Sequence, residues 1–357
     1  MKRPWLQAIR EPELTADWTI GQWQEAVRQL RRLRLLARLA EALAAADRLG
    51  GVPEPAARLL LAERQTSRYR RRVVSFAATR IGRTLAELGA PRLLLKGSAY
   101  LAQQLPIAAG RLPSDLDILV PKDALPRAQQ MLLAEGWQEP DLDEHDRRYY
   151  LEWSHEVPPM QHPMHPVELD LHHNVLPPLG PVAIDMALLL RDCRACDWSG
   201  WSVLAPVDQV LHSAAHLFFD SEPLERVRDL VDLDGLMRHH AARDDRFWAT
   251  LQQRAQTLGL MEPLLLAAHF CRAWLDTPID AALVQRLQRA GPRQRLLRAL
   301  FAAVLEPAAL DRPRPRGQRL AAALILWRYH LRRMPLHLLV PHLWHKLNKP
   351  RADPSPQ

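Results

Sequence analysis

The chain has 357 residues, of which 48% are hydrophobic and 25% are charged, and its formal net charge is +8. This is the composition of a soluble globular protein that is long enough to bury a sizeable core. The sequence shows no apolar run of roughly 18 residues and no signal-peptide core, which argues against a membrane-spanning or secreted protein. We therefore expect a cytoplasmic location.

The positive charge is carried by 43 arginines and only 5 lysines. Arginine suits phosphate recognition because its planar guanidinium group can pair with two oxygens at once. A positive balance by itself is nonetheless weak evidence for a nucleic-acid partner. The function has to be sought in local motifs.

We expect residues 1–90 to be helical throughout. Apolar residues recur at spacings of three and four from Glu25 to Leu49, which predicts one amphipathic helix that ends at Gly50. A second helix is expected over 54–88, with a predicted core of Leu59, Leu60, Val73, Val74, Phe76, Ala77 and Leu85. This helix also carries a group of arginines that we interpret as a solvated face, the alternative being contact with phosphates: Arg68, Arg70, Arg71 and Arg72.

The first candidate site follows a short apolar run from Leu93 to Leu95, which suits a buried strand. Lys96-Gly97-Ser98 then opens a helix. A strand that feeds a small-residue turn leaves backbone N–H groups pointing outward, ready for a phosphate. Taken alone, however, a Gly-Ser turn is more often a plain helix cap.

A pair of aspartates follows in the segment SDLDILV (114–120). Its alternation predicts a strand with Asp115 and Asp117 on one face. Carboxylates at this spacing lie roughly 6.5–7 Å apart along the strand and can converge on two metal ions about 3.5–4 Å apart. A third carboxylate from a neighbouring strand would complete the site, and Asp170 in the alternating segment VELDLHHNV (167–175) is the candidate.

These three elements, in this order and spacing, resemble the nucleotidyltransferase superfamily typified by DNA polymerase β. Within it, LLLKGSAYLA, Arg111 followed by SDLDILV, and LDLHHNV look like one uncharacterised bacterial nucleotidyltransferase family. The resemblance covers about residues 60–240. It implies an α+β fold in which a small mixed β-sheet forms the nucleotidyltransferase core, framed by N-terminal and C-terminal helical segments.

The resemblance also implies an enzyme that transfers a nucleoside monophosphate from an NTP, such as ATP, to a hydroxyl group of an acceptor. Asp115 and Asp117 would hold two Mg²⁺ ions. Asp170 would ligate the ion that activates the acceptor hydroxyl, and is placed to take its proton. All three are therefore expected to be both catalytic and metal-binding residues.

The same resemblance assigns the nucleotide-binding residues. Gly97 and Ser98 would cradle the β- and γ-phosphates of the NTP. Lys96 or Arg111 would neutralise charge as pyrophosphate leaves. Hard carboxylates together with substrate phosphates favour Mg²⁺ over softer metals.

Two other classes of function remain open. One is a catalytically inactive nucleotide-binding or regulatory protein, against which the three retained carboxylates argue. The other is a nucleic-acid-modifying nucleotidyltransferase, which the charge favours but for which no binding module or basic patch with interleaved aromatics is found. We favour a small molecule, sugar, peptide or protein as acceptor. The sequence indicates no oligomeric state.

The segment between the two motifs holds one further candidate. Tyr149, Leu151 and Trp153 alternate along the chain and predict a strand. His155 follows in a turn, where it either contacts substrate or is an ordinary loop histidine, and the sequence favours neither.

The pattern from Val207 onward is helical. In the resembling family, a histidine like His216 and an Arg/Asp pair like Arg228 and Asp232 recur beside the cleft, which makes them accessory site candidates. The same residues would serve equally as a buried polar cluster that holds two helices together.

Three cysteines, Cys193, Cys196 and Cys271, are few and odd in number, so no disulfide framework is implied. Cys193 and Cys196 are spaced like half of a zinc site, but no second cysteine pair occurs. The alternative is a mixed site with His162, His165, His172 and His173. Two ordinary thiols at a helix end is the interpretation that we favour.

We expect four regions: an N-terminal helical region (1–90), a nucleotidyltransferase catalytic core (91–205), a C-terminal helical domain (206–310) and a final segment (311–357). The final segment comprises a Pro/Arg linker (311–319), a terminal helix and a tail. The terminal helix mixes leucine, tryptophan and basic residues. We favour a packed helix over peripheral contact with a membrane or a partner.

Overall fold

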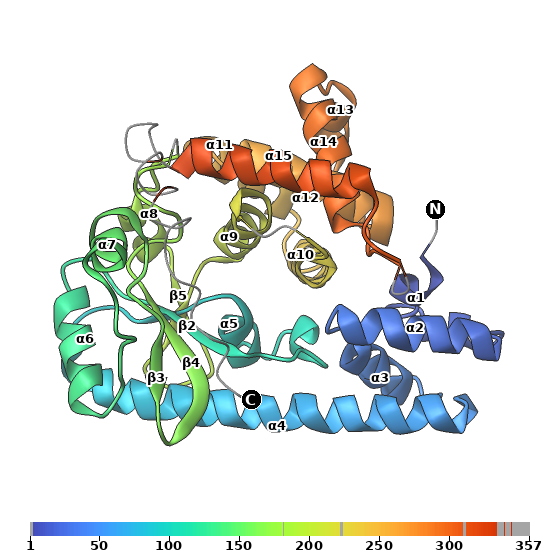
Figure 1. Ribbon diagram of the computed structural model, residues 1–357, viewed down its shortest axis with the longest axis horizontal. Helices are drawn as coiled ribbons and strands as arrows, with labels where there is room; N and C mark the ends of the chain where they lie inside the picture. Colours follow the sequence, from blue (N-terminus) through green and yellow to red (C-terminus); the bar gives the residue numbers. More distant parts are fainter. Residues whose placement is uncertain are drawn as a thin grey trace.

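The long helix α4 (Glu54–Thr84) lies against a mixed β-sheet (Figure 1). The structure is a computed structural model that describes residues 3–180, 182–221, 224–309, 312–333, 339 and 344. Helices predominate around the sheet. The expected α+β fold is confirmed.

The N-terminal part is helical, as expected. It contains α1 (Pro4–Gln7), α2 (Ile20–Arg32), α3 (Leu36–Ala45) and α4, with 3-10 turns at Pro12–Thr15, Leu49–Gly51 and Leu85–Leu88. The prediction of one helix from Glu25 to Leu49 is wrong. The chain breaks between α2 and α3, where Arg34 adopts a left-handed conformation with φ of 57°. Because of this break, both short helices can pack against α4.

The sheet of the described residues has six strands in the order β3-β4-β2-β1-β6-β5. Their bounds are β1 Leu93–Leu94, β2 Asp115–Leu119, β3 Met160–His162, β4 His165–His172, β5 Arg194–Ala195 and β6 Ser202–Val203. The β2–β4 and β1–β6 pairs are parallel, and the β1–β2, β3–β4 and β5–β6 pairs are antiparallel. The two central long strands, β2 and β4, carry the predicted carboxylates.

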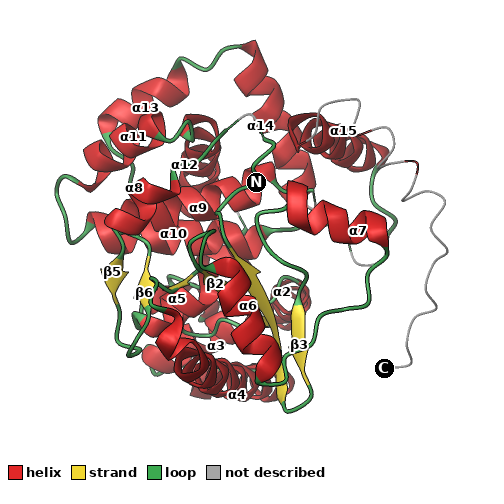
Figure 2. Cartoon of the chain, turned by 90° about the vertical axis from the view of Figure 1, so that its left-hand side faces the viewer, coloured by secondary structure: helices red, strands yellow, loops and turns green. Residues whose placement is uncertain are grey.

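Short helices connect the strands, and a larger helical half follows them. The connecting helices are α5 (Lys96–Ala102), α6 (Leu125–Ala134), α7 (Glu144–Arg148) and α8 (Met186–Arg191), with a 3-10 turn at Pro106–Ala108. The helical half contains α9 (Pro206–Phe219), α10 (Val227–Ala241), α11 (Phe247–Thr257), α12 (Met261–Leu275), α13 (Ala281–Gln288), α14 (Pro292–Leu305) and α15 (Arg316–Arg333). Figure 2 shows α4 on one side of the sheet and α9 and α10 on the other.

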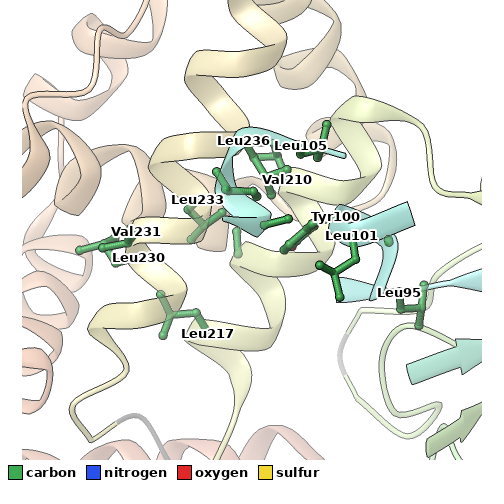
Figure 3. Close-up of a cluster of buried hydrophobic side chains, with 14 of the residues drawn as sticks. Leu95, Tyr100, Leu101, Leu105, Val210, Leu217, Leu230, Val231, Leu233 and Leu236 are labelled. Atoms are coloured by element: carbon green, nitrogen blue, oxygen red, sulfur yellow. The ribbon is translucent and has the colours of Figure 1, made fainter. Parts of the chain in front are cut away.

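One hydrophobic core joins the sheet region to the helical half (Figure 3). Tyr100 and Leu101 on α5 point toward Val210 on α9 and toward Leu233 and Leu236 on α10, and all five side chains are at most 4% exposed. Burial of each leucine contributes about 1.5–3 kcal/mol. The helices that wall the site are therefore fixed against the sheet.

Two further local predictions are wrong. Residues Tyr149–Trp153 form a π-helical turn rather than a strand, because α7, whose N-terminus is capped by the Asp143 side chain, runs directly into them. Leu59 and Phe76 are 38% and 59% exposed instead of buried. Each precedes a buried position of α4 by one residue, about 100° around the helix, so it falls off the single face that the protein covers.

The C-terminal helix α15 begins at Arg316, so the last four residues of the expected linker are helical. It packs against α14 and buries Ala321 and Ile325. Apart from Leu339 and Trp344, the segment beyond Arg333 lies outside the described residues. Within the part of the chain that the structure covers, no helix combines the length and apolarity needed to cross a bilayer.

Candidate active site

Strands β2 and β4 bring the three predicted carboxylates to one place. They run parallel with Asp117 opposite Asp170, and Leu116 and Ile118 point the other way, into the core. Asp115, Asp117 and Asp170 all line one cavity of about 230 Å³ between the sheet and the helical half. We call it the carboxylate cavity.

Helices on the far side close the carboxylate cavity. Its complete lining is Lys96, Tyr100, Arg111, Asp115, Asp117, Glu156, Asp170, Ser213, His216, Arg226, Arg228, Asp229 and Asp232. The cavity thus includes Lys96 and Arg111, which were expected to contact nucleotide, and all three accessory candidates. Sequence reasoning missed Tyr100, Glu156, Ser213, Arg226 and Asp229.

Asp117 is the most strongly held of the three carboxylates and is only 2% exposed. Lys96 Nζ donates a hydrogen bond to its Oδ1 at 2.6 Å, and His172 Nε2 lies 3.2 Å from the same oxygen. Burial opposes ionisation, but the neighbouring Lys96 and His172 hold the pKa of Asp117 well below its usual range. Burial disfavours the charged form of Lys96 as well. The negative charge of Asp117 outweighs this effect and raises the pKa of the lysine.

Asp170 faces the opposite electrostatic situation. Burial and the negative charges of Asp117 and Glu156 raise its pKa to about 8. Its carboxyl group therefore takes up a proton near neutral pH unless a cation compensates it. Such uncompensated negative charge, presented by hard oxygen donors, is what a divalent cation site offers.

Asp117 and Asp170 lie at a spacing that a metal ion could bridge, and His172 lies beside them. Among the described residues, ligand atoms of Asp117, Asp170 and His172 lie within 4.8 Å of one another. Asp115 lines the same cavity but does not belong to that group. His172 approaches because β4 continues in register past Asp170 alongside β2.

Gly97 and Ser98 lie in the first turn of α5, behind the cavity wall rather than in it. A Cβ atom at Gly97 would overlap the Arg111 guanidinium, so glycine is required for Arg111 to pack there. The Ser98 hydroxyl donates to the Leu95 carbonyl at 3.2 Å. Gly97 thus leaves room for Arg111, and Ser98 bonds within the first turn of α5.

The helical wall is a network of paired charges. Asp232 on α10 is 2% exposed and binds two guanidinium groups, those of Arg38 from α3 and Arg111, the latter through Nε at 3.1 Å. The expected Arg228/Asp232 pair is not formed, because Arg228 lies against Asp229 instead, at 3.4 Å. Asp232 therefore ties the N-terminal helices, the core and α10 together.

His216 and Arg226 close the other end of the helical wall. Arg226 Nη2 lies 2.8 Å from His216 Nδ1, and its Nη1 donates to Asp220 at 2.6 Å. Burial, and then the positive charges of Lys96 and Arg226, lower the pKa of His216 well below its usual value. The imidazole is therefore neutral and accepts from Arg226.

A second cavity of about 230 Å³ adjoins the first, and Lys96, Glu156 and His216 line both. We call it the outer cavity. Its remaining wall is mixed in character and comprises His155, Val175, Leu176, Pro177, Gly180, Val182, Ala215, Phe219, Asp220, Ser221, Tyr329, Arg332 and Arg333.

Other sequence candidates lie elsewhere. The arginines of α4 do not line either cavity, and Arg68 pairs with Glu41. Cys196 Sγ lies 3.5 Å from the Trp201 carbonyl, and neither group of metal-spaced side chains in the described chain contains a cysteine. The interpretation of Cys193 and Cys196 as ordinary thiols stays a prediction.

A model of a family of uncharacterised nucleotidyltransferases matches residues 21–276 of the chain. The chain belongs to this family. The match runs from α2 through α12 and includes every residue that lines the carboxylate cavity. The protein is accordingly a nucleotidyltransferase, a transferase of phosphorus-containing groups. No curated protein and no solved structure matches it.

Proposed function

We propose that this nucleotidyltransferase transfers a nucleoside monophosphate from an NTP to a hydroxyl group of an acceptor and releases pyrophosphate, with Mg²⁺ as its metal. The observation that carries the proposal is the meeting of Asp115, Asp117 and Asp170 around one cavity, from two parallel strands in register. Membership of the family supports the class of reaction.

Asp115, Asp117 and Asp170 are the residues that would hold Mg²⁺. The pKa of Asp170, raised by burial and by its acidic neighbours, supports this assignment, because the cluster carries more negative charge than its protein partners neutralise. Bound Mg²⁺ would supply charge neutralisation and lower the pKa of the acceptor hydroxyl.

The cationic wall of the cavity would bind the triphosphate. Lys96, Arg111, Arg226 and Arg228 all line the cavity, and Lys96 is bonded to Asp117 of the carboxylate trio. Charged donors fixed in a partly buried cavity stabilise the negative charge that develops as pyrophosphate leaves. The role of Gly97 in this scheme is to leave room for the Arg111 guanidinium.

Asp170 would act as proton acceptor for the hydroxyl group. A carboxylate that ligates the metal ion bound to the acceptor hydroxyl is held within reach of the proton that this hydroxyl loses. The acceptor would enter through the outer cavity, which meets the carboxylate cavity at Glu156. Its confined volume of about 230 Å³ favours a small molecule, sugar or peptide over a nucleic-acid strand.

The test is to incubate the full chain with each labelled NTP and Mg²⁺, together with pools of hydroxyl-bearing acceptors, and to measure pyrophosphate release and label transfer. Transfer that is lost in Asp115→Asn and kept in Glu168→Gln supports the proposal. Glu168 is the matched control, because it is an exposed carboxylate opposite Asp115 in the register and does not line the cavity. Tight Mg-NTP binding without pyrophosphate release from any pool would instead identify a nucleotide-binding protein without turnover.

A further inference from the structure

Three side chains outside the carboxylate trio meet where the 155–157 segment crosses the end of β4. Val157 N–H donates to the Leu171 carbonyl at 3.0 Å and His173 N–H donates to the His155 carbonyl at 2.8 Å. These backbone bonds hold Glu156 opposite His172 in an isolated β-bridge. Ligand atoms of His155, Glu156 and His172 lie within 4.8 Å of one another.

His172 lies between Asp117 and Glu156. Its Nε2 lies 3.2 Å from the Asp117 carboxylate, which can only accept a hydrogen bond, so Nε2 is the donor of this contact and Nδ1 is the nitrogen that faces Glu156. Nδ1 is buried, has no hydrogen-bond partner among the described residues, and lies 3.2 Å from Glu156 Oε2.

Both imidazoles approach the Glu156 carboxylate. The His172 side chain is only 2% exposed, and its Nδ1 lies against Glu156 Oε2 without a hydrogen bond. His155 approaches the same carboxylate, with its Nε2 3.8 Å from Glu156 Oε2. A buried polar nitrogen without a partner is costly, and this one has a carboxylate and a second imidazole beside it.

We infer that His155, Glu156 and His172 bind a divalent transition-metal ion of the Zn²⁺ class. Two imidazoles and one carboxylate are a common ligand set for such ions, whereas Mg²⁺ prefers oxygen donors alone. With metal–ligand bonds of about 2.0–2.1 Å, ligand atoms of a tetrahedral site lie roughly 3.3–3.4 Å apart. The observed separations of 3.2 Å and 3.8 Å from Glu156 Oε2 bracket that value.

This site is distinct from the carboxylate trio but touches it. His172 donates to Asp117, so an ion on Nδ1 fixes the ring that orients this carboxylate. With three protein ligands, the fourth coordination position is available to water or to an acceptor oxygen from the outer cavity, which His155 and Glu156 line.

The experiment is a titration of the metal-free full chain with Co²⁺ alone as the probe, in excess Mg²⁺ so that the carboxylate trio is saturated. We expect an equimolar complex with the visible absorption of four-coordinate Co²⁺, which Zn²⁺ displaces. His155→Ala and the more conservative Glu156→Gln should each weaken Co²⁺ binding by at least about 100-fold, since loss of an outer partner alone costs roughly 10- to 100-fold. His165→Ala, which changes a half-buried histidine outside the cluster, is the matched control and should bind as the unaltered chain does.

Equal Co²⁺ affinity in His155→Ala and the unaltered chain would overturn the inference. So would a complex without the four-coordinate spectrum, or one that survives in both cluster variants and is lost in Asp170→Asn, since that result assigns the ion to the carboxylate trio. The readout is the spectrum of the bound metal. Failure of nucleotidyl transfer with Mg²⁺ alone is therefore a separate result, and it leaves this test intact.

Discussion

The carboxylate cavity has a sheet wall, formed by β2 and β4, and a helical wall, formed by α9 and α10. An aspartate on each wall lies in an opposite electrostatic environment. On the helical wall, Asp232 is compensated by two guanidinium groups, those of Arg38 and Arg111. On the sheet wall, Asp170 is half-buried and has no ion pair among the described residues, and burial with its acidic neighbours raises its pKa to about 8. A buried carboxylate that is paired with cationic side chains stabilises the fold. A carboxylate without such a partner is free to bind a cation or a proton.

The largest expected effect concerns catalysis on the sheet wall. Asp115→Asn should lower turnover by about 10³-fold or more, because metal-ion catalysis is worth several kcal/mol of transition-state stabilisation. The fold should be retained, since Asp115 is only half-buried. Steady-state pyrophosphate release at saturating Mg²⁺ measures this, with Glu168→Gln as the control. Equal turnover in Asp115→Asn and the unaltered chain would remove the carboxylate trio from the mechanism.

The next effect should appear in stability, on the helical wall. Asp232→Asn leaves Arg38 and Arg111 buried without their partner, and breaking a buried ion pair in this way costs about 3–5 kcal/mol. Asp170→Asn should show no comparable loss. Urea unfolding of both variants sharpens the comparison, and equal midpoints would show that the two aspartates play the same role.

A smaller effect is expected at the turn behind Arg111. Gly97→Val forces the Arg111 guanidinium out of its place against α5, so NTP affinity should fall by about 10-fold or more, which is about 1.4 kcal/mol. Ser98→Ala removes only a hydrogen bond to the Leu95 carbonyl and should leave NTP affinity nearly unchanged. Calorimetric titration of both variants is the measurement. Unchanged affinity in Gly97→Val would mean that Arg111 does not contact nucleotide.

The remaining effect is a pH-dependent change in thermal stability at Asp170. In metal-free protein, its folded pKa of about 8 exceeds the unfolded value of about 3.9. Stability from this group is therefore complete below about pH 4 and is lost as pH rises toward 8. Asparagine does not ionise, so Asp170→Asn should melt at a higher temperature than the unaltered chain at roughly pH 9. At roughly pH 4 the two proteins should melt at similar temperatures. The melting temperature should rise by about 2 °C for each kcal/mol of added stability. Saturating Mg²⁺ should abolish the advantage. A pH-independent difference would contradict the raised pKa.

Much of the sheet wall could be predicted from sequence because strand alternation is a local pattern. Asp115 and Asp117 share a face for that reason, and Asp170 was found by the same rule. The helical wall could not be predicted, because Arg38 and Asp232 are 194 residues apart and no local spacing signals their contact. Glu156 was missed for a similar reason, since a single β-bridge between a loop and the end of β4 brings it to His172.

Local alternation also misled where helical context overrode it. Tyr149 and Trp153 are spaced as in a strand, but the helix capped by Asp143 continues into them and forms a π-helical turn. The one-helix prediction over 25–49 failed for a different reason. The apolar spacing is continuous there, and the break at Arg34 depends on the packing of both short helices against α4.

The measurement that tests the central claim most directly is the nucleotide affinity and the single-turnover rate of Asp170→Asn, determined together. Binding of Mg-NTP should be retained, because Asp115, Asp117, Lys96 and Arg111 remain in the carboxylate cavity. The chemical step should slow by about 10²-fold or more, since both metal ligation and proton acceptance at the acceptor hydroxyl are lost. Retained binding with lost turnover is the predicted result. Unchanged turnover would place Asp170 outside the reaction and contradict the account.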